Sequence, residues 1–135
     1  MADIRTVTDT FSVAPQLSPV ELTTAATLGF SLVINNRPDG ESPDQPSAAE
    51  IEVAARAQGM DYLHIPVVGG ATPDQVQQMT SAIVRAEGKV LAFCRSGTRS
   101  ITTWCLGRAE AGDDPRELVD LAARAGYDLS GLLGR

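Results

Sequence analysis

Apolar residues occur in two patterns that alternate along the chain. Short, nearly continuous apolar runs at 11–14, 31–35, 62–67 and 89–93 are typical of buried strands. Between and after them, segments with apolar positions three or four residues apart begin with capping signals and end at glycine, which predicts helices at about 19–28, 47–58, 72–88 and 114–124. A further helical pattern follows the last strand, at Ile101, Trp104 and Cys105. This alternation predicts an α/β fold with a mostly parallel central sheet flanked by helices.

Three loops of this fold are expected at the carboxyl ends of the strands, where parallel sheets bind ligands. They follow Asn35, Val67 and Phe93. The first loop, 36–46, contains three prolines and a Pro-Asp-Gly turn, so it cannot continue a helix or a strand. Pro66 either limits the strand before the second loop or places that strand near an edge. The chemistry should therefore lie in these loops.

Composition narrows the class of protein. The 135 residues fit one domain, 1–135, with 43% hydrophobic and 21% charged residues. Eleven Lys and Arg against 17 Asp and Glu give a net charge of −6, which disfavours nucleic acid as a partner. No apolar run approaches the ~18 residues of a membrane-spanning helix, and the N-terminus lacks the layout of a signal peptide. We therefore expect no membrane partner, a cytoplasmic location and cysteines that are free thiols.

The third loop carries the residues of a nucleophilic site. It comprises Cys94, Arg95, Ser96, Gly97, Thr98, Arg99 and Ser100. Because the loop joins a buried strand to a helix, backbone N–H groups and the helix N-terminus should converge on the sulfur and favour the thiolate, with added positive charge from the two arginines. The glycine permits positive φ, and the three hydroxyls can donate to a thiolate or an anion. We predict that Cys94 is a nucleophile inside an anion-binding loop.

Other candidate groups are expected to be structural. Cys105 lies beside Trp104 in an apolar helical stretch, so it should be a core thiol that is alkylated far more slowly than Cys94. His64 has apolar neighbours in its strand. One histidine and two well-separated cysteines give no recognisable zinc spacing, so we expect neither a metal nor a cofactor.

The 94–100 loop resembles the active-site loops of two kinds of thiolate enzyme, the cysteine-based tyrosine and dual-specificity phosphatases and the rhodanese-type sulfurtransferases. The order of elements, with residues 33–41 and the later Ile65-Pro66-Val67, further resembles a small bacterial family described as beta-lactamase-hydrolase-like, phosphatase-like domains, or as candidate sulfurtransferases. This resemblance covers roughly residues 11–107. It implies a cysteine-phosphatase-like architecture of three layers.

Loop length distinguishes the two chemistries. Phosphatases of this kind have five residues between cysteine and arginine, whereas four separate Cys94 from Arg99, as in the rhodanese-like loop. Phe93 stands where phosphatases usually have histidine, and Gly69 stands near the expected position of their general-acid aspartate. A phosphatase would therefore need another acid.

Three acidic residues are candidates for that acid. Asp74 is one, although an acidic residue in the first turn of a helix is also explained by the helix dipole. Asp39 and Glu41 are the others, and they form either a solvated turn or, with Asn36 and Arg37, a wall of the active-site cleft.

Three functions stay open at this point. The leading hypothesis is a sulfurtransferase in which Cys94 carries sulfane sulfur as a persulfide. Arg95 and Arg99 would bind a small anionic or persulfide donor. A partner enzyme in sulfur metabolism is compatible with this role. The alternative is a phosphomonoester hydrolase that forms a phosphocysteine, with Ser100 assisting its breakdown and Asp74 or Asp39 as acid. A non-catalytic anion-binding or thiol-redox module is the third.

Overall fold

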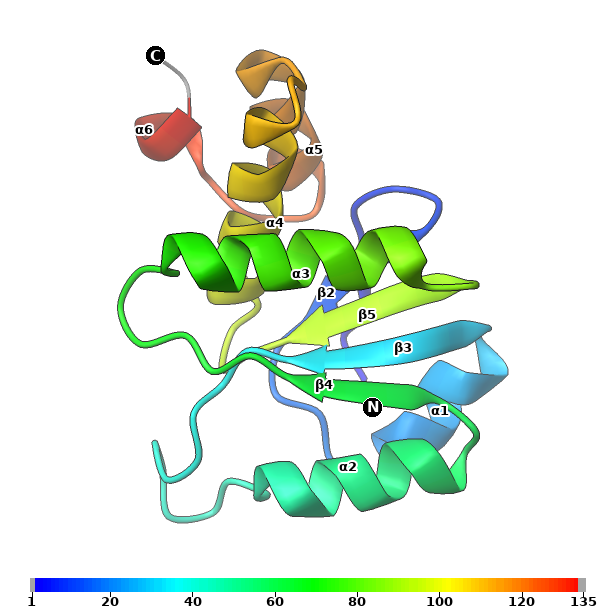
Figure 1. Ribbon diagram of the computed structural model, residues 1–135. Coiled ribbons are helices and arrows are strands. Elements are labelled where there is room, and N and C mark those ends of the chain that lie inside the picture. The colour runs from blue at the N-terminus through cyan, green and yellow to red at the C-terminus, as the bar shows by residue number, and fades with distance from the viewer. Residues whose placement is uncertain (1, 134–135) are drawn as a thin grey trace.

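The computed structural model describes residues 2–133, which form a five-stranded sheet with helices on both faces (Figure 1). The order across the sheet is β1-β2-β5-β3-β4, and only the β1–β2 pair is antiparallel. The strands are β1 (Arg5–Thr6), β2 (Phe11–Ala14), β3 (Phe30–Asn35), β4 (Asp61–His64) and β5 (Lys89–Phe93). The helices are α1 (Glu21–Thr27), α2 (Ala48–Ala57), α3 (Pro73–Arg85), α4 (Thr98–Glu110), α5 (Pro115–Arg124) and α6 (Ser130–Leu133). The predicted α/β fold with a mostly parallel sheet is confirmed.

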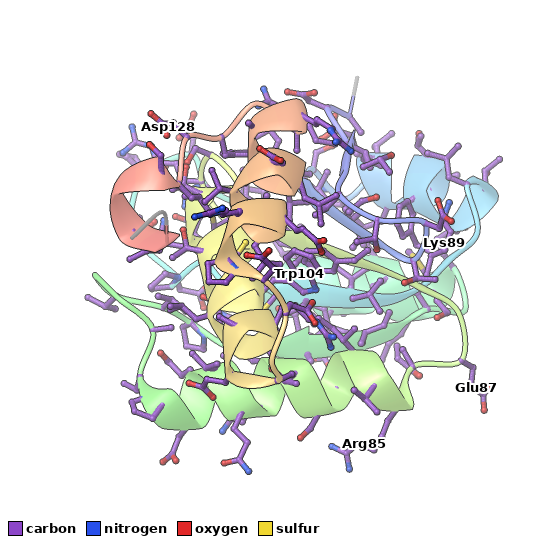
Figure 2. All side chains as sticks on the ribbon, turned by 90° about the horizontal axis from the view of Figure 1, so that it is seen from above. Arg85, Glu87, Lys89, Trp104 and Asp128 are labelled. Carbon is purple, nitrogen blue, oxygen red and sulfur yellow. The ribbon has the colours of Figure 1, made fainter. Side chains whose placement is uncertain are left out.

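Each face of the sheet has its own hydrophobic core. Neighbouring residues of β3 illustrate the division, since Val33 packs with the core under α1 and α2 whereas Ile34 packs with the core under α3, α4 and α5. Phe11 of β2 stacks on Trp104 of α4 with ring centroids 5.0 Å apart. Trp104 is labelled on α4 in Figure 2. The architecture is therefore three layers, with helices above and below the sheet in Figure 1.

The capping signals predicted for α2, α3 and α5 act as expected, whereas the N-cap of α1 is Val20 and not Ser18. Ser47 and Glu50 form a reciprocal capping box at the start of α2, and Thr72 and Gln75 form one at the start of α3. The Asp114 side chain accepts from a backbone N–H in the first turn of α5.

Some boundaries differ from the sequence prediction. α1 begins at Glu21 instead of residue 19, because its entry turn is held by i to i+3 bonds such as Glu21 N–H to Ser18 C=O at 3.1 Å. β4 is an edge strand that ends at His64, shortly before Pro66, which has no N–H to donate. α3 ends at Arg85, before Gly88, and the chain becomes extended before β5. β1 and α6 were not predicted from the sequence.

The topology brings the candidate loops to one edge of the sheet. β5 lies between β2 and β3, and Phe93 is in register with both Ala14 and Asn35. The loops that follow these strands therefore leave the sheet together, at the left in Figure 1. None of the helices within residues 2–133 is long and apolar enough to cross a membrane.

Candidate active site

Cys94 occupies the position directly after the central strand β5 and is fully buried. The backbone N–H of Gly97 donates to its sulfur at 3.1 Å. Gly97 has φ +94° and is the N-cap of α4, so the loop turns sharply enough to place the start of that helix near the sulfur. A hydrogen bond from the backbone and the positive end of a helix dipole both stabilise a thiolate, which is the nucleophilic form of cysteine.

Arg99 lies in the first turn of α4 and is held in a fixed orientation. Its Nη1 and Nη2 atoms each donate to a carboxylate oxygen of Glu41 at 2.8 Å, and Nη1 also donates to the Val67 carbonyl at 2.9 Å. The pKa of Arg99 is raised, mainly by its hydrogen bond to Glu41, against the effect of burial and with a contribution from the nearby charge of Cys94. Of its five donors, Nε–H and one Nη2–H are not used by Glu41 or Val67, and a side-chain hydrogen bond between Arg99 and Cys94 draws on this edge of the guanidinium.

Glu41 is the carboxylate that positions this arginine. Besides Arg99, it accepts from Arg37 Nε at 3.0 Å. These two partners, Arg99 first, lower the pKa of Glu41 to about 2 against its burial. Glu41 is therefore ionised throughout the neutral range and has no proton to give to a leaving group.

A Glu41→Gln variant should show how much the positioning of Arg99 by Glu41 contributes to turnover, and how much it contributes to the stability of the fold. We expect turnover to fall by about 10- to 100-fold, because the guanidinium of Arg99 loses its charged bidentate partner. The pKa of Glu41 is lowered from 4.5 to about 2 in the folded state, so its ion pairs stabilise the fold fully above pH ~5 and lose that effect as the pH falls toward 2. Denaturation of both proteins at pH 7 and pH 3 measures this, and the wild-type advantage should shrink at pH 3.

The matched control is Glu52→Gln, which removes an exposed ion pair with Arg56 on α2. Such a pair contributes little, so neither turnover nor the pH dependence of stability should change. Equal effects of the two substitutions would contradict the positioning role of Glu41.

Ser100 and Asn36 form a buried pair beside the loop. The Ser100 hydroxyl donates to Asn36 Oδ1 at 2.8 Å, and Asn36 Nδ2 donates to the Ile65 carbonyl at 3.0 Å. This pair ties the start of α4 to the ends of β3 and β4. Because the hydroxyl proton is already engaged, Ser100 presents oxygen lone pairs, not its proton, to any further group.

Arg37 supports the site through its contact with Glu41. It is buried, and its Nε, Nη1 and Nη2 atoms bond Glu41, Gln16 and Ser42 respectively. Arg37 therefore supports Glu41 and does not form a wall of the cleft, the position that its place in the 36–46 loop suggested. The His64 ring contacts the Arg37 carbonyl at 2.9 Å, in keeping with a structural role.

Two of the residues predicted as candidates for the general acid have other roles in the structure. The Asp39 carboxylate accepts from the Ala48 N–H at 2.7 Å, where it supplements the cap of α2. Asp74 is exposed in the first turn of α3, beside Gln77 and Gln78 in a shallow depression. Neither carboxylate has a hydrogen bond with the 94–100 loop among the described residues.

The remaining loop residues form its outer rim. Ser96 and Thr98 are exposed and hydrogen-bond each other through their hydroxyls at 3.0 Å, and Arg95 is exposed beside them.

Within residues 2–133, no group of three or more His, Cys, Asp and Glu side chains is arranged to hold a metal ion. Cys105 is fully buried on α4, and burial raises its pKa to about 12, so it stays protonated.

Two residues that hold the loop were not predicted from the sequence. The Gln16 N–H donates to the Arg95 carbonyl at 3.2 Å, and the Tyr127 hydroxyl donates to the Ser96 carbonyl at 2.8 Å. Both lie far from the loop in sequence. No pattern around either residue marks it, because the contact depends on how the whole chain folds.

The chain is similar to a known protein family over most of its length. The family described as "Beta-lactamase hydrolase-like protein, phosphatase-like domain" matches residues 3–111. The chain belongs to this family. It is 36% identical over 125 residues to the beta-lactamase hydrolase-like protein of Agrobacterium fabrum and 34% identical to that of Xylella fastidiosa, covering 91% of this chain and 29% of each relative. The chain thus spans less than a third of the length of these relatives.

Solved structures agree with the fold. A candidate phosphatase from Neisseria meningitidis is 32% identical, with a TM-score of 0.88 over 98% of this chain and 95% of that chain. The active form of Tk-PTP is 21% identical, with a TM-score of 0.74 over 93% and 86% of the two chains. The family and cysteine-phosphatase-like fold expected from the loop are confirmed. The chain therefore has the fold of cysteine-based phosphatases, with a cysteine at the start of the loop that follows its central strand.

Proposed function

We propose that the domain is a sulfurtransferase in which Cys94 accepts sulfane sulfur from a small anionic donor. The observation that carries the proposal is that Glu41 is bonded by two arginines, Arg99 and Arg37, because these contacts keep the carboxylate ionised, with a lowered pKa, and leave it no proton to donate. With thiosulfate as donor, the Cys94 thiolate attacks the outer sulfur and forms an S–S bond. The original S–S bond breaks and sulfite leaves with the electron pair. No proton is transferred in this step.

Phosphate transfer from an alkyl ester, in contrast, is accelerated by a general acid. The P–O bond breaks toward an alkoxide, and a positioned acid that protonates it contributes typically 10²–10⁴ in rate. The loop also has four residues between Cys94 and Arg99, which makes a smaller ring of N–H groups. Such a ring suits the terminal sulfur of a persulfide better than a tetrahedral phosphoryl group.

Phosphomonoester hydrolysis is the second candidate, and the comparisons favour it over sulfur transfer. The family is described as phosphatase-like, and the 32% identical structure from Neisseria meningitidis is described as a candidate phosphatase. In this reaction Cys94 would attack phosphorus, the ester oxygen would leave with the bonding electrons, and water would hydrolyse the phosphocysteine. Aryl phosphates, whose leaving groups need little protonation, would be the substrates.

Intact-mass spectrometry after incubation with thiosulfate tests the first proposal. We expect a gain of one sulfur atom on Cys94, which cyanide then removes as thiocyanate. Parallel assays with an aryl phosphate and an alkyl phosphate test the second candidate. The absence of a sulfur adduct with thiosulfate and with a persulfide donor would overturn sulfur transfer. Turnover of the aryl ester would then support the hydrolase, and anion binding without turnover would support a non-catalytic module.

The cellular context stays a prediction. A net charge of −6 still favours small molecules over nucleic acid as partners. A cytoplasmic location and a partner enzyme in sulfur metabolism are predictions from the sequence alone.

A further inference from the structure

The segment after α5 reaches the outer side of the Cys94 loop. In Figure 2, Lys89 at the start of β5 and Asp128 just after this helix lie at opposite ends of the molecule, so the segment lies toward the carboxyl ends of the strands. Tyr127 is buried there, and its hydroxyl donates to the Ser96 carbonyl at 2.8 Å. Tyr127 lies beyond residues 3–111, which the family match covers.

The peptide between Ser96 and Gly97 has a hydrogen bond on each side. Its carbonyl accepts from Tyr127, and its N–H donates to the sulfur of Cys94 at 3.1 Å. No cis peptide bond occurs among the described residues, and the C=O and N–H of a trans peptide point in opposite directions. A hydrogen bond that holds the carbonyl outward therefore holds the N–H inward, toward the sulfur.

We propose that Tyr127 is a positioning residue that acts on Cys94 through this peptide. Its hydroxyl fixes the orientation in which the Gly97 N–H stabilises the thiolate. The preceding peptide is held in the same way, since the Gln16 N–H donates to the Arg95 carbonyl at 3.2 Å. Two consecutive carbonyls of the loop are thus bonded on the outside, which prevents either peptide from turning over.

Tyr127 is itself held from two directions. Gly126, with φ +98°, ends α5, and the Tyr127 N–H then donates to the Ala122 carbonyl at 2.9 Å. The Arg5 guanidinium lies 5.1 Å from the centre of the tyrosine ring and donates to the Ala125 carbonyl at 3.4 Å. The N-terminal strand β1 and the end of α5 therefore clamp the ring behind the loop.

This role does not depend on whether sulfur or phosphate is transferred, because both reactions begin with the Cys94 thiolate. The experiment can therefore use alkylation of the thiol, which requires no turnover. A failure of the proposed function and a failure of this inference are then distinguishable.

The test measures the rate of iodoacetamide labelling of each cysteine from pH 5 to pH 10 in the wild type and in Tyr127→Phe. Phenylalanine keeps the ring and removes only the hydroxyl. We expect labelling of Cys94 at pH 6 to slow by about three- to tenfold, and the difference between the two proteins to shrink as the pH rises, because the hydroxyl acts only on how well the thiolate is stabilised. Cys105 should stay unlabelled in both.

A further variant separates positioning from packing. Tyr62→Phe removes a hydroxyl that accepts from Asn35 at 3.1 Å outside the loop, and it should retain the wild-type pH profile. The proposal is overturned if Tyr127→Phe also retains that profile, or if Cys105 of Tyr127→Phe labels as fast as Cys94, which would make Tyr127 a residue of the core.

Discussion

Replacing Cys94 with serine should abolish group transfer, with a loss of turnover on the order of 10³-fold or more. Serine keeps the size and the hydrogen bond from Gly97, but its hydroxyl is not ionised near neutral pH. It also cannot form a persulfide with a sulfane donor. The thiosulfate adduct should disappear from the mass spectrum, and any turnover of an aryl phosphate should disappear with it, because both reactions use the same sulfur.

Cys105→Ala is the matched control for this prediction. Cys105 is buried on α4, with a pKa raised to about 12, so it contributes no thiolate. Alanine leaves a small cavity that should cost about 1 kcal/mol in unfolding free energy and should leave the adduct on Cys94 intact. Persistence of the adduct in Cys94→Ser, or its loss in Cys105→Ala, would show that the nucleophile has been assigned to the wrong cysteine.

The strands and helices could be predicted because each is encoded locally. Capping pairs such as Ser47 with Glu50 satisfy backbone N–H groups within one turn of the helix. Glycines such as Gly59, with φ +80°, end a helix through their own backbone conformation, without help from distant residues. β1 escaped prediction because two residues carry no period of hydrophobicity, and this strand exists only through its pairing with β2.

The nucleophilic loop could also be predicted, because a strand, a tight loop and a helix N-terminus are contiguous around Cys94. The support of that loop could not be predicted. Glu41 bonds an arginine 58 positions away, and Tyr127 bonds a carbonyl 31 positions away. Both contacts are created by the crossing of distant segments at one edge of the sheet. Glu41 was identified only as an acid candidate or a wall of the cleft, and the two-arginine clamp that keeps it ionised is visible only in the folded protein.

Gly97→Ala should cause the largest loss of stability of any single methyl group added to the site. Gly97 has φ +94°, a region that costs an L-residue roughly 1–2 kcal/mol. A Cβ at this position would also overlap the Tyr127 hydroxyl, so the bond from Tyr127 to Ser96 must break or the loop must shift. Losing that bond costs about 1 kcal/mol more. We expect a total of about 2–3 kcal/mol in unfolding free energy, measured by chemical denaturation.

Gly112→Ala provides the control, because it isolates the backbone strain from the overlap. Gly112 has φ +103°, after the end of α4, and a Cβ there would meet no atom within 4 Å. This variant should lose only the roughly 1–2 kcal/mol of strain and keep the wild-type rate of Cys94 labelling. Gly97→Ala should in addition label Cys94 more slowly at pH 6, since the N–H that stabilises the thiolate moves with the displaced peptide. Equal losses of stability and equal labelling rates in the two variants would mean that the contact between Gly97 and Tyr127 does not shape the loop.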